Sequence, residues 1–122
     1  MAKLVIKETL IKNSILDYLH YKNIFCWLNN TSGNYSIKTN SYYKNPRLLR
    51  GVADIIGLLP DGRLLAIECK SGKNRQSAEQ INFQNGIVGN KGIYILAYSL
   101  DDVEFALNKI RLLTPYVPTP KN

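Results

Sequence analysis

Three residues in the middle of the chain could together hold a divalent cation beside a phosphate group. Asp54 ends the run Gly51-Val52-Ala53-Asp54, and Glu68-Cys69-Lys70 follows after thirteen intervening residues. Carboxylate oxygens are ligands that Mg²⁺ prefers, and a lysine amine is a compact cation that can stabilise a phosphate or move a proton. Two carboxylates and an amine on a rigid element are therefore the parts needed to cleave a phosphodiester bond with a metal ion.

The rigid element is predicted to be a β-hairpin. Apolar runs at residues 55–59 and 64–67 lie on either side of a turn sequence. In Leu59-Pro60-Asp61-Gly62, the proline presets φ for a type I turn and the glycine supplies a left-handed residue. A turn of this kind makes a three-residue loop, so we expect Leu59 to pair with Arg63.

This register decides where the acids lie. Counting back along both strands places Asp54 directly opposite Glu68, and side-chain alternation then puts Asp54, Glu68 and Lys70 on one face. Directly opposed residues have Cβ atoms about 5 Å apart, close enough for two carboxylates to share one ion. A two-residue loop at Asp61-Gly62 would instead set Asp54 against Cys69 and send the two acids to opposite faces.

A simpler interpretation of the acids is that they are surface residues at a hairpin end, with Lys70 as their salt-bridge partner. Like charges at this separation repel without a cation, and one would be pushed towards its neutral form. A hairpin that served only stability would not place them there.

The composition is that of one folded domain. The chain has 122 residues, 45% of them hydrophobic and 20% charged, which is ordinary for a globular protein with a single core. It has no apolar run long enough to cross a membrane and no signal-peptide pattern at its start, so we expect a cytoplasmic protein. Two cysteines, Cys26 and Cys69, and one histidine, His20, argue against a disulfide framework, zinc catalysis and a serine–histidine triad.

The charge indicates a polyanionic partner. The formal net charge is +7, and cations that neutralise phosphates release condensed counterions. A polar loop at residues 31–50 interleaves tyrosines with cations, a pattern that can stack bases and neutralise phosphates, and residues 71–75 form a second basic loop. A basic protein with a flexible tyrosine-rich loop and no such partner is the alternative. The candidate DNA-binding residues are Lys38, Tyr42, Tyr43, Lys44, Arg47, Arg50, Lys73 and Arg75.

The order of the elements predicts an α/β fold. We expect helices at residues 6–21, 78–88 and 101–110, strands at residues 24–28 and 92–97 beside the hairpin, and a disordered tail at residues 114–122. Ser77 and Gln80 have the spacing of a capping box, and Gly89 would cap the same helix at its end. A helix between the second hairpin strand and the last strand favours a parallel crossover. The expected fold is a single-domain three-layer sandwich in which helices flank a central mixed β-sheet.

Two further polar residues lie at positions that suit the same site. Glu8 borders the apolar stripe that Ile11 and Ile15 form on the first helix, where a lone carboxylate is unusual. Gln80 lies in the first turn of the helix that follows the hairpin. The alternatives are a glutamate that reaches water from the edge of the stripe and a glutamine that serves only the capping box.

Together these residues resemble the PD-(D/E)xK nuclease superfamily, and within it the small VRR-NUC (virus-type replication-repair nuclease) domain. The resemblance covers most of the chain, and one departure is Ala53, where the superfamily has a proline that serves backbone geometry. It implies a restriction-endonuclease-like core over residues 1–113, and a nuclease that uses Mg²⁺ or, in its place, Mn²⁺. The residues that carry it are Glu8, Asn29 at the strand end, Gly51-Val52-Ala53-Asp54, Glu68-Cys69-Lys70 and Gln80.

The resemblance also implies roles for the site residues. Asp54 and Glu68 would ligate Mg²⁺, and the backbone carbonyl of Cys69 would add a ligand. Lys70 would orient or deprotonate the attacking water and stabilise the charged phosphate. Gln80 would orient Lys70 or the water by a hydrogen bond.

Glu8 would contact a metal-bound water or a second ion. Stand-alone domains of this kind resemble Holliday-junction resolvases, which act as homodimers. We therefore expect an endonuclease that cuts branched or structured DNA in phage or mobile-element replication and repair. The rival expectations are a non-catalytic DNA-binding module and an interaction subunit that recruits replication proteins.

Overall fold

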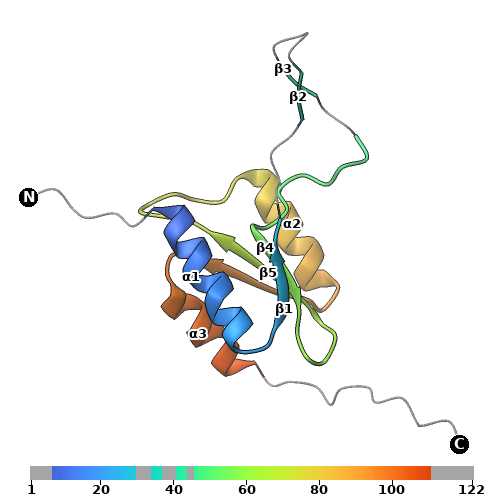
Figure 1. The fold of residues 1–122 in the computed structure, drawn as a ribbon. Coiled ribbons are helices and arrows are strands. Elements are labelled where there is room, and N and C mark those ends of the chain that lie inside the picture. The colour runs from blue at the N-terminus through green and yellow to red at the C-terminus, as the bar shows by residue number, and fades with distance from the viewer. Residues whose placement is uncertain (1–6, 30–33, 37–40, 44–45, 111–122) are drawn as a thin grey trace, which may run out of the picture.

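The computed structural model confirms a mixed α/β fold with one main sheet (Figure 1). It describes residues 7–29 and 46–110, and residues 34–36 and 41–43 by their backbone alone. No helix in these ranges is long and apolar enough to cross a membrane. The elements are α1 (Glu8–Tyr21), β1 (Phe25–Leu28), β2 (Asn34–Ser36), β3 (Ser41–Tyr43), β4 (Ile55–Leu58), β5 (Leu64–Cys69), α2 (Ala78–Gly89), β6 (Ile93–Ala97) and α3 (Leu100–Lys109).

The main sheet has the strand order β1-β4-β5-β6. β4 is antiparallel to both of its neighbours, β1 and β5, whereas β6 is parallel to β5. The chain passes from β5 to β6 through α2, which is the parallel crossover that the sequence predicts. The two hairpin strands are consequently the central strands of the sheet.

Helices cover both faces of this sheet (Figure 1). α1 and α3 pack together on one face, where the residues spaced four apart along α1, Ile11, Ile15 and Leu19, are buried as predicted. α2 packs on the other face and places Phe83 against Ala66 of β5. The protein thus has two hydrophobic layers, one on each side of the sheet.

The hairpin between β4 and β5 closes with the predicted three-residue loop. The N–H of Leu59 donates to the carbonyl of Arg63 at 2.9 Å, and the N–H of Gly62 donates to the carbonyl of Leu59 at 2.8 Å. Gly62 has φ +91°, the left-handed conformation that the turn requires. The Asp61 carboxylate accepts from the backbone N–H of Arg63 at 3.1 Å and pairs with its guanidinium at 2.7 Å, which fixes the loop from within.

α2 ends one residue later than predicted, and Gly89 is not its cap. The helix continues through Gly89, Asn90 caps it, and the left-handed residue is Lys91, with φ 67°. The N–H groups of Lys91 and Gly92 donate to carbonyls of the last turn at 3.0 and 2.8 Å, a Schellman arrangement. A Cβ on Gly92 would lie 2.7 Å from the side chain of Ile87, so the chain uses this glycine for a close approach and reverses direction at Lys91.

The prediction of a continuous loop over residues 31–50 is also wrong. β2 and β3 pair antiparallel, with Asn34 opposite Tyr43, and form a separate two-stranded sheet. These three-residue strands are polar and lack the apolar alternation by which a strand is recognised in a sequence. The predicted tail at residues 114–122 lies outside the described residues.

A close contact joins the segment before β4 to the start of α2. Gly51 has φ +74°, and a Cβ on this residue would lie 2.3 Å from the carbonyl oxygen of Glu79 and 2.6 Å from the nitrogen of Gln80. The chain can therefore cross the first turn of α2 only with glycine at this position.

Replacing Gly51 with alanine should destabilise the fold far more than the same change at Gly62. Both residues have positive φ, which costs a side chain about 1–2 kcal/mol, but nothing lies within 4 Å of a Cβ on Gly62. We expect Gly62→Ala to lower the free energy of unfolding by about 1–2 kcal/mol and Gly51→Ala by at least about 3 kcal/mol. Urea denaturation followed by circular dichroism measures both, and equal losses would contradict the close packing at Gly51.

Candidate active site

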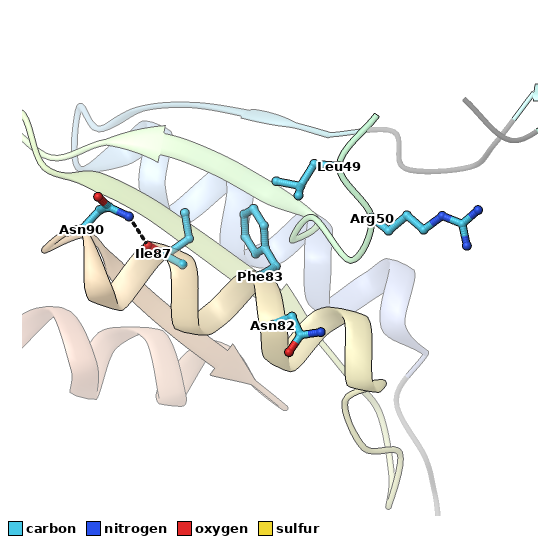
Figure 2. Close-up of a pocket in the computed structure, with 7 residues that line it drawn as sticks. Leu49, Arg50, Asn82, Phe83, Ile87 and Asn90 are labelled. Carbon is cyan, nitrogen blue, oxygen red and sulfur yellow. Dashed lines mark hydrogen bonds between the residues drawn. The ribbon is translucent and has the colours of Figure 1, made fainter. Parts of the chain in front are cut away.

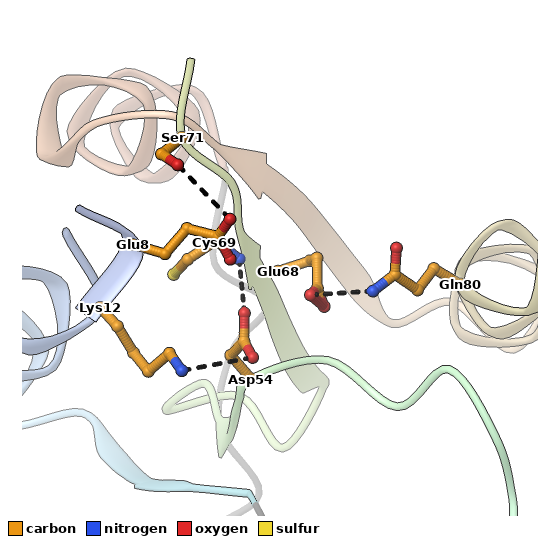
Figure 3. A network of polar contacts seen from close by, with 7 residues as sticks. All are labelled: Glu8, Lys12, Asp54, Glu68, Cys69, Ser71 and Gln80. Carbon is orange, nitrogen blue, oxygen red and sulfur yellow. Dashed lines mark hydrogen bonds and ion pairs between the residues drawn. The ribbon is translucent and has the colours of Figure 1, made fainter. Parts of the chain in front are cut away.

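The β4–β5 register brings Asp54 to Glu68. Ile55 pairs with Ile67, so Asp54, one residue before β4, is aligned with Glu68 of β5, as the turn predicts. Asp54 is anchored across the hairpin because its Oδ2 accepts a hydrogen bond from the backbone N–H of Cys69 at 2.8 Å (Figure 3). The competing register, which would send the acids to opposite faces, is excluded.

Asp54 is also tied to α1 and to the end of β1. The Nζ of Lys12 lies 3.6 Å from its Oδ1, with side chains that are 29% and 18% exposed, respectively. The carbonyl of Asp54 accepts from the backbone N–H of Asn29 at 2.7 Å. Lys12 is not among the predicted site residues, although it follows Glu8 by one helical turn and so shares its face of α1.

Glu68 is a buried carboxylate with one oxygen left unsatisfied. Its side chain lies in the centre of the sheet and the residue is only 4% exposed. Oε1 accepts a hydrogen bond from Nε2 of Gln80 at 3.1 Å (Figure 3). Oε2 is buried and has no hydrogen-bond partner among the described residues. Buried polar atoms are rarely left in this state, so this oxygen calls for a ligand or a proton.

The surroundings of Glu68 favour its neutral form when no cation is present. Burial, then the negative charge and the close carboxyl group of Asp54, raise the pKa of Glu68 to about 8. The charge of Lys70 opposes this shift and that of Glu8 adds to it. A proton on one of the two carboxylates would let Oε2 of Glu68 share it with Asp54, and a bound cation could take the place of that proton.

Gln80 joins the start of α2 to Glu68. Its Oε1 accepts from the backbone N–H of Ser77 at 2.8 Å, while Ser77 Oγ accepts from the N–H of Gln80 at 3.1 Å. The predicted capping box is thus confirmed. The amide nitrogen of the same side chain donates to Glu68, so the capping box is not the only interaction that Gln80 makes. Its contact is with the carboxylate, whereas the sequence suggested Lys70 or a water as its partner.

Cys69 and Lys70 contribute differently to the site. Cys69 is fully buried, and this burial, followed by the charges of Asp54 and Glu68, raises the pKa of its thiol to about 12. Such a thiol is no nucleophile, and Cys69 serves the site through its backbone N–H. Lys70 is half-buried just beyond β5, its backbone N–H donates to the carbonyl of Ala97 at 2.9 Å, and its charge acts on Glu68.

Glu8 faces the site from the first turn of α1. It is half-buried, and its Oε2 accepts from Ser71 Oγ at 3.5 Å (Figure 3). The same oxygen accepts from Asn74 Nδ2 at 3.2 Å. These contacts tie the start of α1 to the loop after Lys70. The alternative expectation, a glutamate that only reaches water, is therefore incomplete, because Glu8 also accepts hydrogen bonds from two protein side chains.

The predicted DNA-binding residues fall into two groups. Arg47, Arg50, Lys73 and Arg75 are exposed, and Arg50 pairs with Glu79 of α2 at 3.4 Å. The others cannot be placed by their side chains: Lys38 and Lys44 lie outside the described residues, and Tyr42 and Tyr43 belong to β3, where the backbone alone is described.

A separate hollow lies between residues 49–50 and α2. Leu49 lies across it from Phe83 and Ile87 of α2, and Arg50 borders it (Figure 2). Its lining includes none of the predicted metal-ligand or catalytic residues. Asn82, Gly86 and Asn90 complete the lining.

The predicted metal ligands do not form a large cluster. In the part of the chain that the structure describes, no group of three or more histidine, cysteine, aspartate and glutamate residues is placed to hold a metal ion. Comparison with protein-family models, curated proteins and solved structures finds no match to this chain.

The raised pKa of Glu68 predicts how stability varies with pH in the absence of metal. Between the ordinary value of 4.5 and about 8 the folded protein holds a proton that the unfolded chain has lost, so stability falls as pH rises through this window. The loss is at most about 1.4 kcal/mol per pH unit. Glu68→Gln keeps an acceptor for Gln80 and removes the titration. In EDTA, thermal melts at pH 5 and pH 8 should therefore differ less for this variant than for the wild type.

Asp17→Asn is the matched control, because it removes the same charge from an exposed position on α1. It should retain the wild-type dependence on pH. If Glu68→Gln and the wild type lose stability equally from pH 5 to pH 8, the carboxylate is not held neutral by its surroundings.

Proposed function

We propose that this protein is a metal-dependent nuclease that hydrolyses phosphodiester bonds in DNA. The observation that carries this proposal is the buried, unsatisfied Oε2 of Glu68 next to the carboxylate of Asp54. A fold gains no stability from this arrangement, whereas a divalent cation would neutralise both charges and ligate the free oxygen. The formal charge of +7 supports a polyanionic substrate.

The residues present fit Mg²⁺, with Mn²⁺ as a substitute. Mg²⁺ keeps several waters and is commonly bound by one or two carboxylates together with substrate phosphates, so a set of three acidic ligands is not required. Asp54 and Glu68 would hold it, the carbonyl of Cys69 would add a ligand, and Glu8 would contact a water or a second ion. Bound there, a divalent cation supplies charge neutralisation and activation of water for phosphoryl transfer.

The chain's own groups position these ligands. The N–H of Cys69 and the amine of Lys12 hold the two oxygens of Asp54, while Gln80 holds Oε1 of Glu68 and leaves Oε2 free. Lys70 places a positive charge close to Glu68, where it would stabilise a phosphate or move a proton of the attacking water. This arrangement needs little movement before a substrate binds.

We further propose that the fold is a PD-(D/E)xK core of the VRR-NUC kind. A mixed sheet with helices on both faces, acids at the ends of its two central strands, and a glutamine on the following helix support this assignment. The proposed substrate is branched or structured DNA in phage or mobile-element replication and repair. The proposed assembly is a homodimer.

The exposed cations Arg47, Lys73 and Arg75 favour a second candidate function, a DNA-binding module without turnover. Such a module would use the fold and the basic side chains, but would have no use for a metal. The unsatisfied oxygen of Glu68 weighs against this candidate. The same assay separates the two functions, because a binding module retains DNA without cutting it.

Cutting of DNA should require a divalent cation and the central residues of the site. Purified protein incubated with four-way-junction, duplex and single-stranded DNA should cut in Mg²⁺ or Mn²⁺ and not in EDTA. The variants Asp54→Asn, Glu68→Gln and Lys70→Met should cut at rates below detection, because each removes a ligand or the cation that acts on the phosphate. Gln80→Ala should retain a rate lowered by about 10- to 100-fold, since it only positions Glu68.

Asp17→Asn again serves as the control and should cut at the wild-type rate. DNA binding without cutting in either metal would reject the nuclease in favour of the binding module. Unchanged cutting by both Asp54→Asn and Glu68→Gln would place the catalytic centre elsewhere.

A further inference from the structure

β1 carries two aromatic side chains that the fold leaves uncovered. Phe25 is 66% exposed and Trp27 is 44% exposed, although both belong to a strand of the main sheet. Their ring centroids are 5.4 Å apart. Cys26, between them, is buried in the core under α1, so the two rings point to the opposite face of the sheet, the side on which α2 packs.

The aromatic pair extends the apolar surface of that face to the edge of the sheet. β1 is an edge strand, and Phe25 is paired with Leu58, which is itself 40% exposed. Trp27 is paired with Ile56, which packs into the core under α2. An exposed apolar strip of this kind usually marks a binding surface.

This strip lies next to the acid pair. Ile56 is paired with Trp27 on one side and with Ala66 on the other. Glu68 follows Ala66 by two residues on the same face, where Gln80 of α2 donates to it, whereas Asp54, two residues before Ile56, is held by Lys12 of α1. Asn29, two residues after Trp27, donates its backbone N–H to the carbonyl of Asp54 at 2.7 Å, so Trp27 and Asp54 occupy diagonal backbone positions on neighbouring strands, about 7–8 Å apart.

We propose that Phe25 and Trp27 form a stacking platform for unpaired bases of the strand held at the acid site. This inference rests on the proposed function and narrows its substrate. Aromatic rings stack on bases of any identity, and a separation of about 7–8 Å corresponds to about two nucleotides at about 3.4 Å per nucleotide. In a continuous duplex those bases are paired with each other and cannot reach the rings. The substrate class is therefore a strand with unpaired bases beside the cut: a single strand, a flap or an open junction arm.

Charge favours a nucleic acid as the occupant of this strip. The net charge of +7 attracts a phosphate backbone. Lys70, whose charge acts on Glu68, adds a cation beside the acid pair that would attract the same backbone. A single strand would then run from the strip to the acid site.

The fluorescence of Trp27 tests the platform directly, because it is the chain's one tryptophan. In EDTA, where nothing is cut, the protein is titrated with oligothymidine and with a blunt hairpin duplex. Stacking of thymine on the indole should quench the emission with the single strand and leave it nearly unchanged with the duplex.

Fluorescence anisotropy of labelled oligothymidine then measures how much Trp27 contributes to the affinity for a single strand. Trp27→Ala should bind the single strand about 5- to 100-fold more weakly and the duplex as before, and Trp27→Phe should retain most of the affinity. Phe105→Ala is the matched control, since Phe105 is a 64% exposed aromatic on α3, which packs on the opposite face of the sheet. Circular dichroism melts confirm that each variant is folded.

The outcomes separate this inference from the nuclease itself. Unchanged single-strand affinity in Trp27→Ala, or equal weakening for single strand and duplex, overturns the platform. If Trp27→Ala instead converts a dimer to a monomer in sedimentation, with DNA binding intact, the strip is an interface between copies and the platform is rejected. Metal-dependent cutting of junctions at the wild-type rate by Trp27→Ala would reject the platform and leave the nuclease standing. Quenching of Trp27 by oligothymidine, together with no cutting of DNA in Mg²⁺ or Mn²⁺, would support the platform and reject the nuclease.

Discussion

The pairing of β4 with β5 is the constraint on which the site depends. Side chains of a strand alternate between the two faces of the sheet, so a shift of the register by one residue would move every side chain of the strand to the opposite face. Two independent features select the same register. The loop closes through Gly62 and Asp61, and the neighbouring Ile55 and Ile67 are both fully buried, which a slip by one residue would reverse. Asp54 is brought to its position by both, although neither feature involves it.

The folded state accepts an electrostatic cost to hold two acids together. Three donors from different elements serve the pair, yet one oxygen of Glu68 remains without a partner. Replacing such a group by an apolar residue of similar size is often neutral or stabilising in proteins, so burial alone gives no reason to keep it. The two hydrophobic layers on either side of the sheet supply the stability that offsets this cost. Unfavourable local arrangements that persist in this way are characteristic of functional sites.

Local sequence patterns predict much of this structure. The predictions fail where a contact joins residues that are far apart in the sequence. The hairpin turn, the capping box and the stripe of α1 each involve residues within a few positions of one another, and all three are confirmed. Lys12 could not be assigned to Asp54, because the position of α1 on the sheet is set by packing. The approach of Gly51 to the first turn of α2 and the left-handed Lys91 depend likewise on where neighbouring elements lie. Gln80 contacts Glu68, and this partner could not be named from the sequence because it depends on the depth of Glu68 in the sheet.

Gln80 links the order of the candidate site to the stability of the first turn of α2. One end of its side chain closes the first turn of α2 and the other end orients a buried carboxylate. Helix termini open locally at a free energy well below that of global unfolding. Each time this turn frays, Glu68 loses its donor, so the rigidity of a candidate metal ligand at the centre of the sheet is set by a local equilibrium at a helix end. Exchange of the Gln80 amide hydrogen, which is bonded to Ser77 Oγ, would then report on the order of the site more directly than the melting temperature of the whole protein.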